Sequence, residues 1–204
     1  MNEKLILVIN PGSTSTKIAL FNALEPLKEI DITHQASELA KFSSNLEQLD
    51  FRFAEVEKAL KAWNCRPEDL KAVIGRGGPL KPLSGGVYHV GESLMKDLQS
   101  GKLVDHASIL GGLIACRVAA AAKIPAYIAD PVSVDEFDDI ARISGWPELP
   151  RISLSHALNI KAVVAEVAAD SGRKSEDMNY IVAHLGGGFS IAAHQKGARS
   201  TSTT

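Results

Sequence analysis

The chain has 204 residues, of which 45% are apolar and 23% charged, and its formal net charge is −2 at neutral pH. These values are typical of a soluble globular chain, long enough for one domain or for one domain and part of a second. The small negative charge and the lack of a basic run argue against nucleic-acid and membrane-surface binding. No apolar run approaches the length of a membrane-spanning helix, and Cys65 and Cys116 form no disulfide framework. We therefore expect a cytoplasmic protein with no membrane and no nucleic-acid partner.

The apolar pattern along the chain predicts strands that are first joined as a hairpin and then alternate with helices. Strands are expected over residues 5–9, 17–21, 27–33, 72–74, 126–129 and in a hairpin over 180–193. Helices are expected over residues 46–63, 93–98, 106–123 and 153–169, the last ending at Ser171 and Gly172. This order indicates an α/β fold in which helices cover a mixed sheet.

Two turns of similar design lie near the two ends of the chain. The first has the sequence Asn-Pro-Gly-Ser-Thr-Ser-Thr over residues 10–16, and the second has His-Leu-Gly-Gly-Gly over 184–188. Each turn joins two β-rich apolar runs and offers backbone N–H groups and small side chains, which suit a polyphosphate. A pair of such turns facing one another would clamp a nucleotide.

Neither turn fits the common nucleotide-binding motifs. Gly12 and Lys17 are spaced as in a P-loop, but the second glycine is missing and Ile18 stands where Ser or Thr should hold magnesium. The residues after the glycine run at 186–188 form a strand pattern, which excludes a Rossmann fingerprint. A nucleophile elbow and a zinc-ligand spacing are also absent from the sequence.

Five segments resemble the acetokinase family, within the actin/hexokinase/Hsp70-type ATPase superfamily. Residues 8–17 resemble the first phosphate motif of that family, and residues 74–78, 130–132, 156–159 and 184–188 each resemble a further block. The residue sequences of these blocks resemble those of the butyrate kinases more than those of the acetate kinases. The resemblance implies a ribonuclease-H-like, actin-type ATPase lobe over residues 1–150. It also implies a connecting helix and the incomplete start of a second, similar lobe over residues 151–204.

The activity implied by this resemblance is phosphoryl transfer from ATP, with Mg²⁺, to a short-chain carboxylate, which gives an acyl phosphate and ADP. Such a transfer depends on positioning and charge stabilisation more than on covalent catalysis. Butyrate, isobutyrate, propionate and acetate remain open as substrates, because one methylene changes binding by only about 1–3 kcal/mol. Val87 and Tyr88 could line a slot for the alkyl tail. The full-length family is expected to form homo-oligomers.

Three residues are predicted to be catalytic: Arg76, Asp130 and His156. Arg76 offers a planar fork for a carboxylate or a phosphoryl group at a strand end, between glycines that would let a ligand approach. By resemblance, Asp130 positions the carboxylate or helps hold the metal, and His156 contacts the γ-phosphoryl group. The alternatives are a surface arginine, a turn or capping aspartate and a buried structural imidazole.

The remaining candidates are assigned to the substrate, the phosphates and the metal. His106 opens a helix and could bind the anionic substrate with Arg76. Asn10, by resemblance, lies near the magnesium through water, although Asn-Pro-Gly also forms a turn by itself. His34, His89 and His194 are left as structural or surface residues. The residues predicted to bind the ATP phosphates are Gly12, Ser13, Thr14, Ser15, His184, Gly186, Gly187 and Gly188.

The last residues, 198–204, differ from what the resemblance predicts. Family members continue well past the second phosphate turn, whereas this segment has the low-complexity sequence Ala-Arg-Ser-Thr-Ser-Thr-Thr. We expect a truncated chain, in which the hairpin over 180–193 begins a sheet without partner strands and is prone to disorder or association. Two functional readings remain open: a carboxylate kinase present as a fragment, and a non-catalytic remnant or binding module of the same family.

Overall fold

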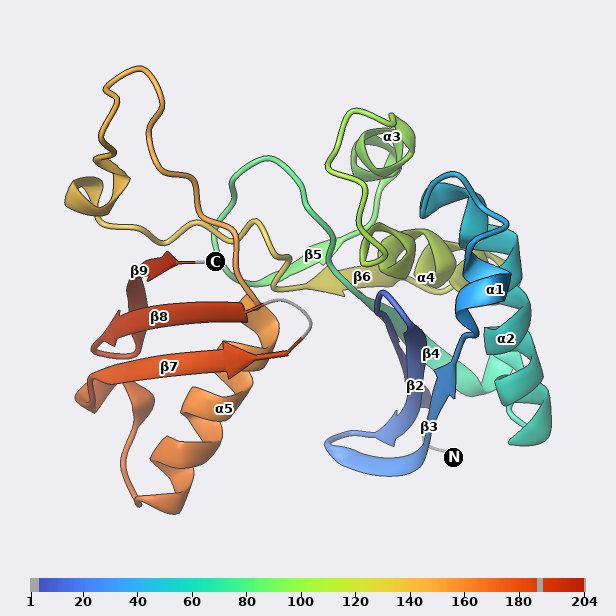
Figure 1. The fold of residues 1–204 in the computed structure, drawn as a ribbon. Coiled ribbons are helices and arrows are strands. Elements are labelled where there is room, and N and C mark those ends of the chain that lie inside the picture. Colours follow the sequence, from blue (N-terminus) through green and yellow to red (C-terminus); the bar gives the residue numbers. More distant parts are fainter. Residues whose placement is uncertain (1–3, 187–188, 204) are drawn as a thin grey trace. The chain divides into compact units, whose positions relative to one another are not determined.

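The computed structural model describes residues 4–186 and 189–203, which divide into two compact units (Figure 1). The first unit comprises Met1–Pro79 and Val87–Ala129, and the second comprises Leu80–Gly86 and Asp130–Thr204. The division expected at residue 150 concerns the domains of the family and stays a prediction.

A six-stranded mixed sheet with the order β3-β2-β1-β4-β6-β5 forms the centre of the first unit. The neighbouring strands β1, β4 and β6 are parallel, and β2, β3 and β5 are antiparallel to the strands beside them. The strands are β1 (Leu5–Pro11), β2 (Ser15–Asn22), β3 (Glu25–Thr33), β4 (Leu70–Arg76), β5 (Val87–His89) and β6 (Ala126–Ala129). The predicted α/β class with a mixed sheet is therefore confirmed, and β5 is a strand that the sequence pattern did not reveal.

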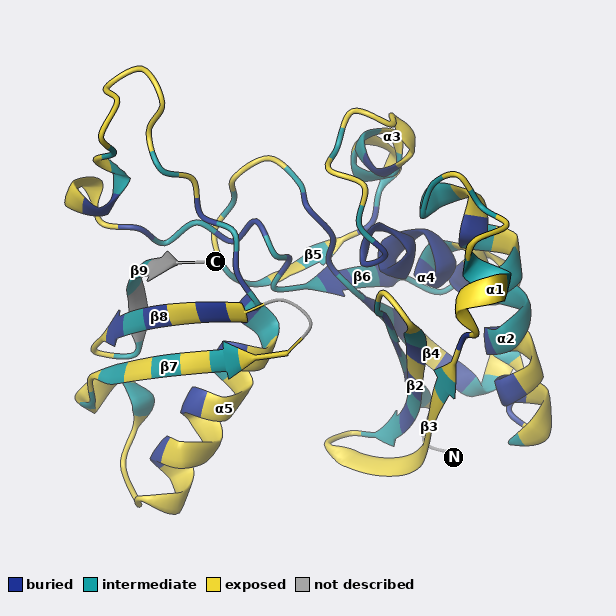
Figure 2. Cartoon of the chain, in the orientation of Figure 1, coloured by how far each residue is buried: buried dark blue, intermediate teal, exposed yellow. Residues whose placement is uncertain are grey.

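Helices of the first unit pack on this sheet and on one another. They are α1 (Ala36–Leu39), α2 (Leu49–Ala62), α3 (Glu92–Gln99) and α4 (Ile109–Ala122), with short 3₁₀ turns at Leu46–Gln48 and Pro67–Asp69. Helix α4 contacts β1, β4 and β6, while α2 contacts α4 and β2. Alternate apolar residues of the strands, such as Leu7, Ile9 and Ile18, are fully buried. Figure 2 shows α4 almost entirely buried and β3 largely exposed, as expected for an edge strand rich in charged residues.

Glycines bring α4 unusually close to β4. A Cβ atom added at Gly75 would lie 2.1 Å from the backbone oxygen of Gly111, and one added at Gly111 would lie 2.3 Å from the backbone oxygen of Arg76. A Cβ at Gly78 would lie 2.8 Å from the backbone of Ile109. The expectation that glycines beside Arg76 make room for a ligand is therefore wrong for Gly75 and Gly78, because helix α4 fills that space.

The second unit consists of a helix and a three-stranded antiparallel sheet, with long loops before them. Its elements are α5 (Ala157–Asp170), β7 (Tyr180–Leu185), β8 (Phe189–Gln195) and β9 (Ala198–Thr203), with 3₁₀ turns at Asp139–Arg142 and Ser175–Asp177. The strand order is β7-β8-β9. Ile160 and Val164 of α5 pack with Ala192 of β8, and Tyr180 and Val182 lie against this core.

The expectation that the hairpin over 180–193 lacks a partner strand is wrong. Residues 198–203 form strand β9, which pairs with β8 over Ile191–Gln195. Serine and threonine favour no helix, and threonine is β-branched, so the segment can add to an available sheet edge despite its low complexity. The hairpin of β7 and β8 therefore has a partner strand.

Two helices begin later than the sequence pattern predicts. Helix α4 begins at Ile109 rather than at residue 106, because the backbone N–H of Ser108 donates to the His106 ring and forms a turn before the helix. Helix α5 begins at Ala157 rather than at residue 153. The segment before it is extended, since the Ser153 hydroxyl donates to the Val134 carbonyl and the Ser155 N–H donates to the Val132 carbonyl.

Candidate functional site

The first phosphate turn is an ordered connection between β1 and β2. The N–H of Gly12 donates to the carbonyl of Ser15 at 2.8 Å, and the N–H of His34 donates to the carbonyl of Thr14 at 2.9 Å. The side chains of Ser13 and Thr14 are exposed. The four residues predicted to contact phosphate here therefore lie together, with hydroxyl groups open to a ligand.

A buried arginine that the sequence analysis missed supports this turn. Arg52 of α2 is 0% exposed, and its Nη1 donates to the Ser15 carbonyl at 2.9 Å and to the Thr16 hydroxyl at 3.0 Å. Burial lowers the pKa of Arg52 to about 10, so the side chain is still a cation at neutral pH. The sequence could have predicted its burial from helical spacing, because Arg52 lies on the same helical face as Val56, Ala59 and Leu60, which are core residues.

Asn10 lies at the end of β1, just before the turn. Its side-chain oxygen Oδ1 is buried and accepts no hydrogen bond from the described residues. A buried amide oxygen without a donor is costly, so this atom fits a donor that comes with a ligand, such as a water molecule on a metal ion. In the described part of the chain, no group of three or more His, Cys, Asp or Glu side chains could hold a metal by itself.

Arg76 and His106 form a second group in the first unit. Arg76 ends β4 and is partly buried, and burial lowers the pKa of its guanidinium. Within residues 4–186 and 189–203, that guanidinium makes no hydrogen bond and no ion pair. A buried cation without an anion is a suitable receptor for an anionic ligand.

The protonation state of His106 follows from its contacts. Its Nδ1 accepts the backbone N–H of Ser108 at 3.1 Å and lies 2.7 Å from the Ser108 hydroxyl. A backbone N–H can only donate, so Nδ1 carries no proton and the remaining proton is on Nε2. Burial, and then the charge of Arg76, lower the pKa of His106. The ring is thus neutral at pH 7 and can donate from Nε2.

Asp130 belongs to an ion-pair cluster of the second unit. Its Oδ1 accepts the N–H of Gly86 at 2.9 Å and a proton of the Lys161 ammonium at 3.3 Å, and Lys161 also bonds Glu136 at 2.6 Å. Burial alone would lower the pKa of Lys161, but the hydrogen bond to Glu136 and the charge of Asp130 raise it overall. Lys161 was missed, although it follows the recognised block at 156–159 by only two residues.

The backbone at Asp130 is held in an uncommon conformation. Its φ of 32° is positive, which costs a non-glycine residue about 1–3 kcal/mol. A Cβ added at Gly85 would lie 1.8 Å from the Lys161 Nζ and 3.1 Å from Asp130 Oδ1. The cluster of Asp130, Glu136 and Lys161 therefore packs directly against a glycine, and its geometry depends on the absence of a side chain there.

Two predicted site histidines meet in the second unit. The rings of His156 and His184 are stacked, with 3.8 Å between centroids and 17° between planes. Nδ1 of His156 lies 2.9 Å from the buried Ser190 hydroxyl, and Nδ1 of His184 lies 2.8 Å from Oδ1 of Asn159. Ser190 and Asn159, neither of them predicted, thus orient the two rings.

The predicted site residues are divided between the two units. Asn10, the turn at 12–15, Arg76 and His106 lie in the first unit, whereas Asp130, His156, His184 and Gly186 lie in the second. Gly187 and Gly188 lie outside the described residues. The structure brings His156 to His184, and the roles assigned to these residues stay predictions.

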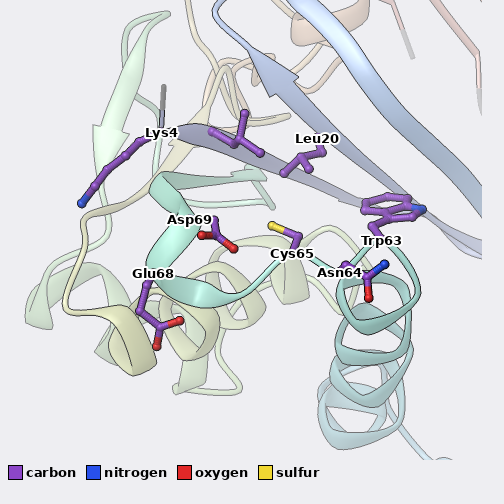
Figure 3. Close-up of a pocket in the computed structure, with 8 residues that line it drawn as sticks. Lys4, Leu20, Trp63, Asn64, Cys65, Glu68 and Asp69 are labelled. Atoms are coloured by element: carbon purple, nitrogen blue, oxygen red, sulfur yellow. The ribbon is translucent and has the colours of Figure 1, made fainter. Parts of the chain in front are cut away.

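One cavity lies away from these residues. It has a volume of about 430 Å³ and lies where β1 begins and α2 ends (Figure 3). Its lining residues are Lys4, Leu5, Leu20, Trp63, Asn64, Cys65, Glu68 and Asp69. Asn10 and Arg76 are at the opposite, carboxyl ends of the parallel strands, where open α/β sheets bind ligands. Burial, and then the charge of Asp69, raise the pKa of the Cys65 thiol, which disfavours its reactive thiolate form.

Two further expectations concern a slot for the alkyl tail and the absence of a membrane-spanning helix. Val87 and Tyr88 lie in the edge strand β5, where the Val87 side chain is exposed, so Val87 lines no buried slot in the first unit. None of the described helices is long and apolar enough to cross a membrane.

Comparison with solved structures defines the class of protein. An acetate kinase from Porphyromonas gingivalis superposes on 98% of this chain and 57% of its own, with a TM-score of 0.68 and 16% identity. A propionate kinase from Francisella tularensis superposes on 98% of this chain and 56% of its own, with a TM-score of 0.61 and 17% identity. At these identities the likeness concerns the fold alone, which is that of the acetate and propionate kinases.

Sequence comparison identifies the relatives more closely. Butyrate kinase 2 of Clostridium acetobutylicum is 50% identical over 192 residues, which are 94% of this chain and 54% of that protein. A probable butyrate kinase of Coprothermobacter proteolyticus is 51% identical over 193 residues, again 94% of this chain and 54% of the relative. No profile of a known protein family matches the chain. The chain is therefore similar to the butyrate kinases over 94% of its length, has the fold of the acetate kinases, and spans about half the length of the curated relatives it matches. The resemblance found in the sequence is thereby confirmed.

Proposed function

We propose that this chain serves the reaction of a butyrate kinase: transfer of the γ-phosphoryl group of ATP to a short-chain carboxylate. A carboxylate oxygen forms a bond to the γ-phosphorus, the bond from that phosphorus to the bridging oxygen breaks, and ADP leaves with the bond's electron pair. The 50% identity to butyrate kinase 2 over 94% of the chain is the observation that carries this proposal. The proposal includes a cytoplasmic location and self-association of the protein.

The carboxylate is assigned to Arg76 and His106. The Arg76 guanidinium is partly buried and unpaired among the described residues, and a carboxylate can accept two parallel N–H bonds from it. The neutral His106 can add a third donor from Nε2. These donors hold the nucleophilic oxygen in place and neutralise its charge, which favours its approach to a phosphate group that is itself anionic.

The ATP phosphates are assigned to the two turns and to the histidine pair. The turn at Gly12–Ser15 supplies hydroxyl and N–H donors, and Gly186, together with the predicted Gly187 and Gly188, supplies the second turn. His156 and His184 are oriented by Ser190 and Asn159, so that a proton on either ring can stabilise charge on the transferring group.

Magnesium is assigned to Asn10, acting through water. The orphaned oxygen of Asn10 supports this assignment, because it fits a donor that comes with the ion. When bound, Mg²⁺ neutralises charge on the β- and γ-phosphates. Asp130 forms an ion pair with Lys161 at 3.3 Å.

The choice of acid is part of the proposal, and butyrate is favoured by the similarity to butyrate kinases alone. Acetate, propionate and isobutyrate are the competing substrates. The alternative function is a binding module that keeps the carboxylate site and the first phosphate turn without turnover.

An acyl-phosphate assay separates these possibilities. The purified chain is incubated with ATP, Mg²⁺ and hydroxylamine, and the hydroxamate formed from butyrate is compared with that from acetate, propionate and isobutyrate. Hydroxamate formation that requires both ATP and the acid supports the kinase. Saturable butyrate binding with no hydroxamate supports the binding module, and no binding of butyrate or MgATP would refute both.

A further inference from the structure

Arg52 occupies an unusual place for an arginine. It lies in the middle of α2, is 0% exposed, and pairs with no carboxylate among the described residues. Burial of a guanidinium without a counter-ion is costly unless its protons are hydrogen-bonded. The bonds that Arg52 makes therefore show what it is held in place to do.

Three of its four hydrogen bonds go to the first phosphate turn. Nη1 donates to the carbonyl of Ser15 at 2.9 Å and to the hydroxyl of Thr16 at 3.0 Å, and Nη2 donates to the carbonyl of Ser13 at 3.4 Å. The fourth bond, from Nε to Oε1 of Gln48 at 2.9 Å, fixes the guanidinium from its own helix. The Arg52 side chain thus bridges the turn. It donates to two carbonyl oxygens that would otherwise repel a phosphate.

His34 supports the same turn through a hydrogen bond with Thr16. A guanidinium can only donate, so the Thr16 oxygen accepts from Arg52, and the same oxygen lies 2.8 Å from Nε2 of His34. Burial, and then the charge of Arg52, lower the pKa of His34, which agrees with a neutral ring. The backbone N–H of the same histidine donates to the Thr14 carbonyl. Residues 13–16 are therefore held from both α2 and the end of β3.

We infer that Arg52 is a positioning residue for the nucleotide phosphates. It holds the turn at 12–16 in one conformation and places a fixed positive charge behind it, while Ser13 and Thr14 remain exposed to the ligand. This inference rests on the proposed function, in which that turn binds the phosphates of ATP. Arg52 itself is fully buried and touches no ligand.

Hydrogen exchange measured on the chain without ligand tests the support of the turn. Arg52→Lys keeps the charge but loses the planar fork, so we expect exchange over residues 10–17 to become about tenfold faster. Exchange over β4 should stay as in the unchanged chain. Unchanged exchange over 10–17 would overturn the inference, as would equal acceleration in β4, which would mean that Arg52 stabilises the whole unit.

Ligand binding by the same variant tests the consequence. We expect MgATP to bind Arg52→Lys about tenfold more weakly, while the affinity for butyrate is unchanged, because Arg76 and His106 are separate from the turn. The matched control is Arg66→Lys, at an exposed arginine whose guanidinium bonds to Asp69, which should change neither affinity.

The outcomes distinguish the inference from the proposed function. An equal loss of MgATP and butyrate affinity, or an unchanged MgATP affinity, would overturn the role of Arg52 and leave the proposed function standing. If the unchanged chain binds no MgATP, the proposed function fails for this chain, and the nucleotide role of Arg52 fails with it. The exchange experiment then still decides whether Arg52 holds the turn.

Discussion

At the scale of single residues, the site depends on buried polar groups whose partners fix their chemistry. The Ser108 N–H makes His106 a donor from Nε2, while burial, followed by the charge of Arg52, lowers the pKa of His34 and keeps its ring neutral. The Asn10 oxygen is the opposite case, because it is buried and no described group donates to it. Buried polar groups without partners are rare in folded proteins, and they mark the places where a ligand would complete the structure.

The role of Arg76 predicts a loss of turnover. If the chain, or an extended form of it, is active, Arg76→Ala should lower kcat at least about tenfold, equivalent to about 1.4 kcal/mol of transition-state stabilisation. The reason is the loss of the bidentate donor for the carboxylate. Hydroxamate formation measures the rate, and Arg66→Ala is the control at an exposed arginine. An unchanged kcat/KM for Arg76→Ala would refute the assigned role.

The environment of His34 predicts a dependence of stability on pH. The unfolded chain takes up a proton at His34 as the pH falls through about 6.5, whereas the folded chain, in which burial lowers this pKa, takes it up only at a lower pH. The unfolded state therefore binds more protons in this window, and the free energy of unfolding decreases as the pH falls below about 6.5.

His34→Gln removes this contribution, so its Tm should fall less between about pH 7.5 and pH 5.5 than that of the unchanged chain. Thermal unfolding followed by circular dichroism at the two pH values gives the comparison. The control is His89→Gln, at an exposed histidine. Equal pH dependence in His34→Gln and the unchanged chain would contradict the assignment of a neutral, buried His34.

At the scale of secondary structure, the contact between α4 and β4 positions Arg76 and His106, the two residues assigned to the carboxylate substrate. Gly75 and Gly111 face one another across this contact, and Gly111 lies against the backbone oxygen of Arg76. The same helix follows directly after His106. The small residues of α4 therefore let the helix approach the strand closely enough to bring two predicted substrate-binding residues to one place.

Gly111→Ala should reduce the free energy of unfolding by about 1–3 kcal/mol, because its Cβ atom would overlap the Arg76 backbone. Urea denaturation measures the change. Gly145→Ala is the matched control, since a Cβ atom there meets nothing within 4 Å. Equal stability of Gly111→Ala and Gly145→Ala would show that α4 can move away from β4 at no cost.

At the scale of the whole molecule, the two units differ in how well their sheets are covered. In the first unit α4 covers the central strands, and the core is extensive. In the second unit α5 covers one face of the sheet, whereas the other face presents apolar side chains. These are Ile181 at 83% exposure, Leu185 at 76%, Phe189 at 52% and Ile191 at 46%. Exposed apolar surface of this kind is uncommon on a soluble monomer.

This face should bind an apolar dye. We expect the chain to enhance the fluorescence of anilinonaphthalene sulfonate while its near-ultraviolet circular dichroism remains that of a folded protein. Ile181→Thr with Ile191→Thr should reduce the enhancement and keep the strands, since threonine is also β-branched. Leu24→Thr is the control, at an isolated leucine 94% exposed. No difference between these variants would contradict an open apolar face.

Much of the fold was predictable because local patterns and the fold agree. The strand at 126–129 and the stop of α5 at Ser171 and Gly172 were predicted correctly, since apolar runs and a glycine at positive φ carry their own signals. Strand β9 was not predicted. Its sequence has little apolar character, and it forms a strand because β8 offers an unpaired edge.

The residue types of the site were predicted from the sequence, but the residues that support them were not. The two turns, Arg76, His156 and His184 lie in recognisable blocks. Arg52 is separated by more than 35 residues from the turn it holds, and Lys161 by 31 from Asp130. Contacts of this range depend on the packing of α2 and α5, which no local pattern encodes.

The sequence by itself determined the order of strands and helices, the two small-residue turns and the similarity to butyrate kinases, because each of these depends on residues that are close together in the chain. Only the tertiary structure decided that Arg52 supports the first turn, that the glycines beside Arg76 serve helix packing, and that His156 stacks on His184. The physical reason is burial: an arginine, a glycine or a histidine acquires its role from the groups that close packing places around it.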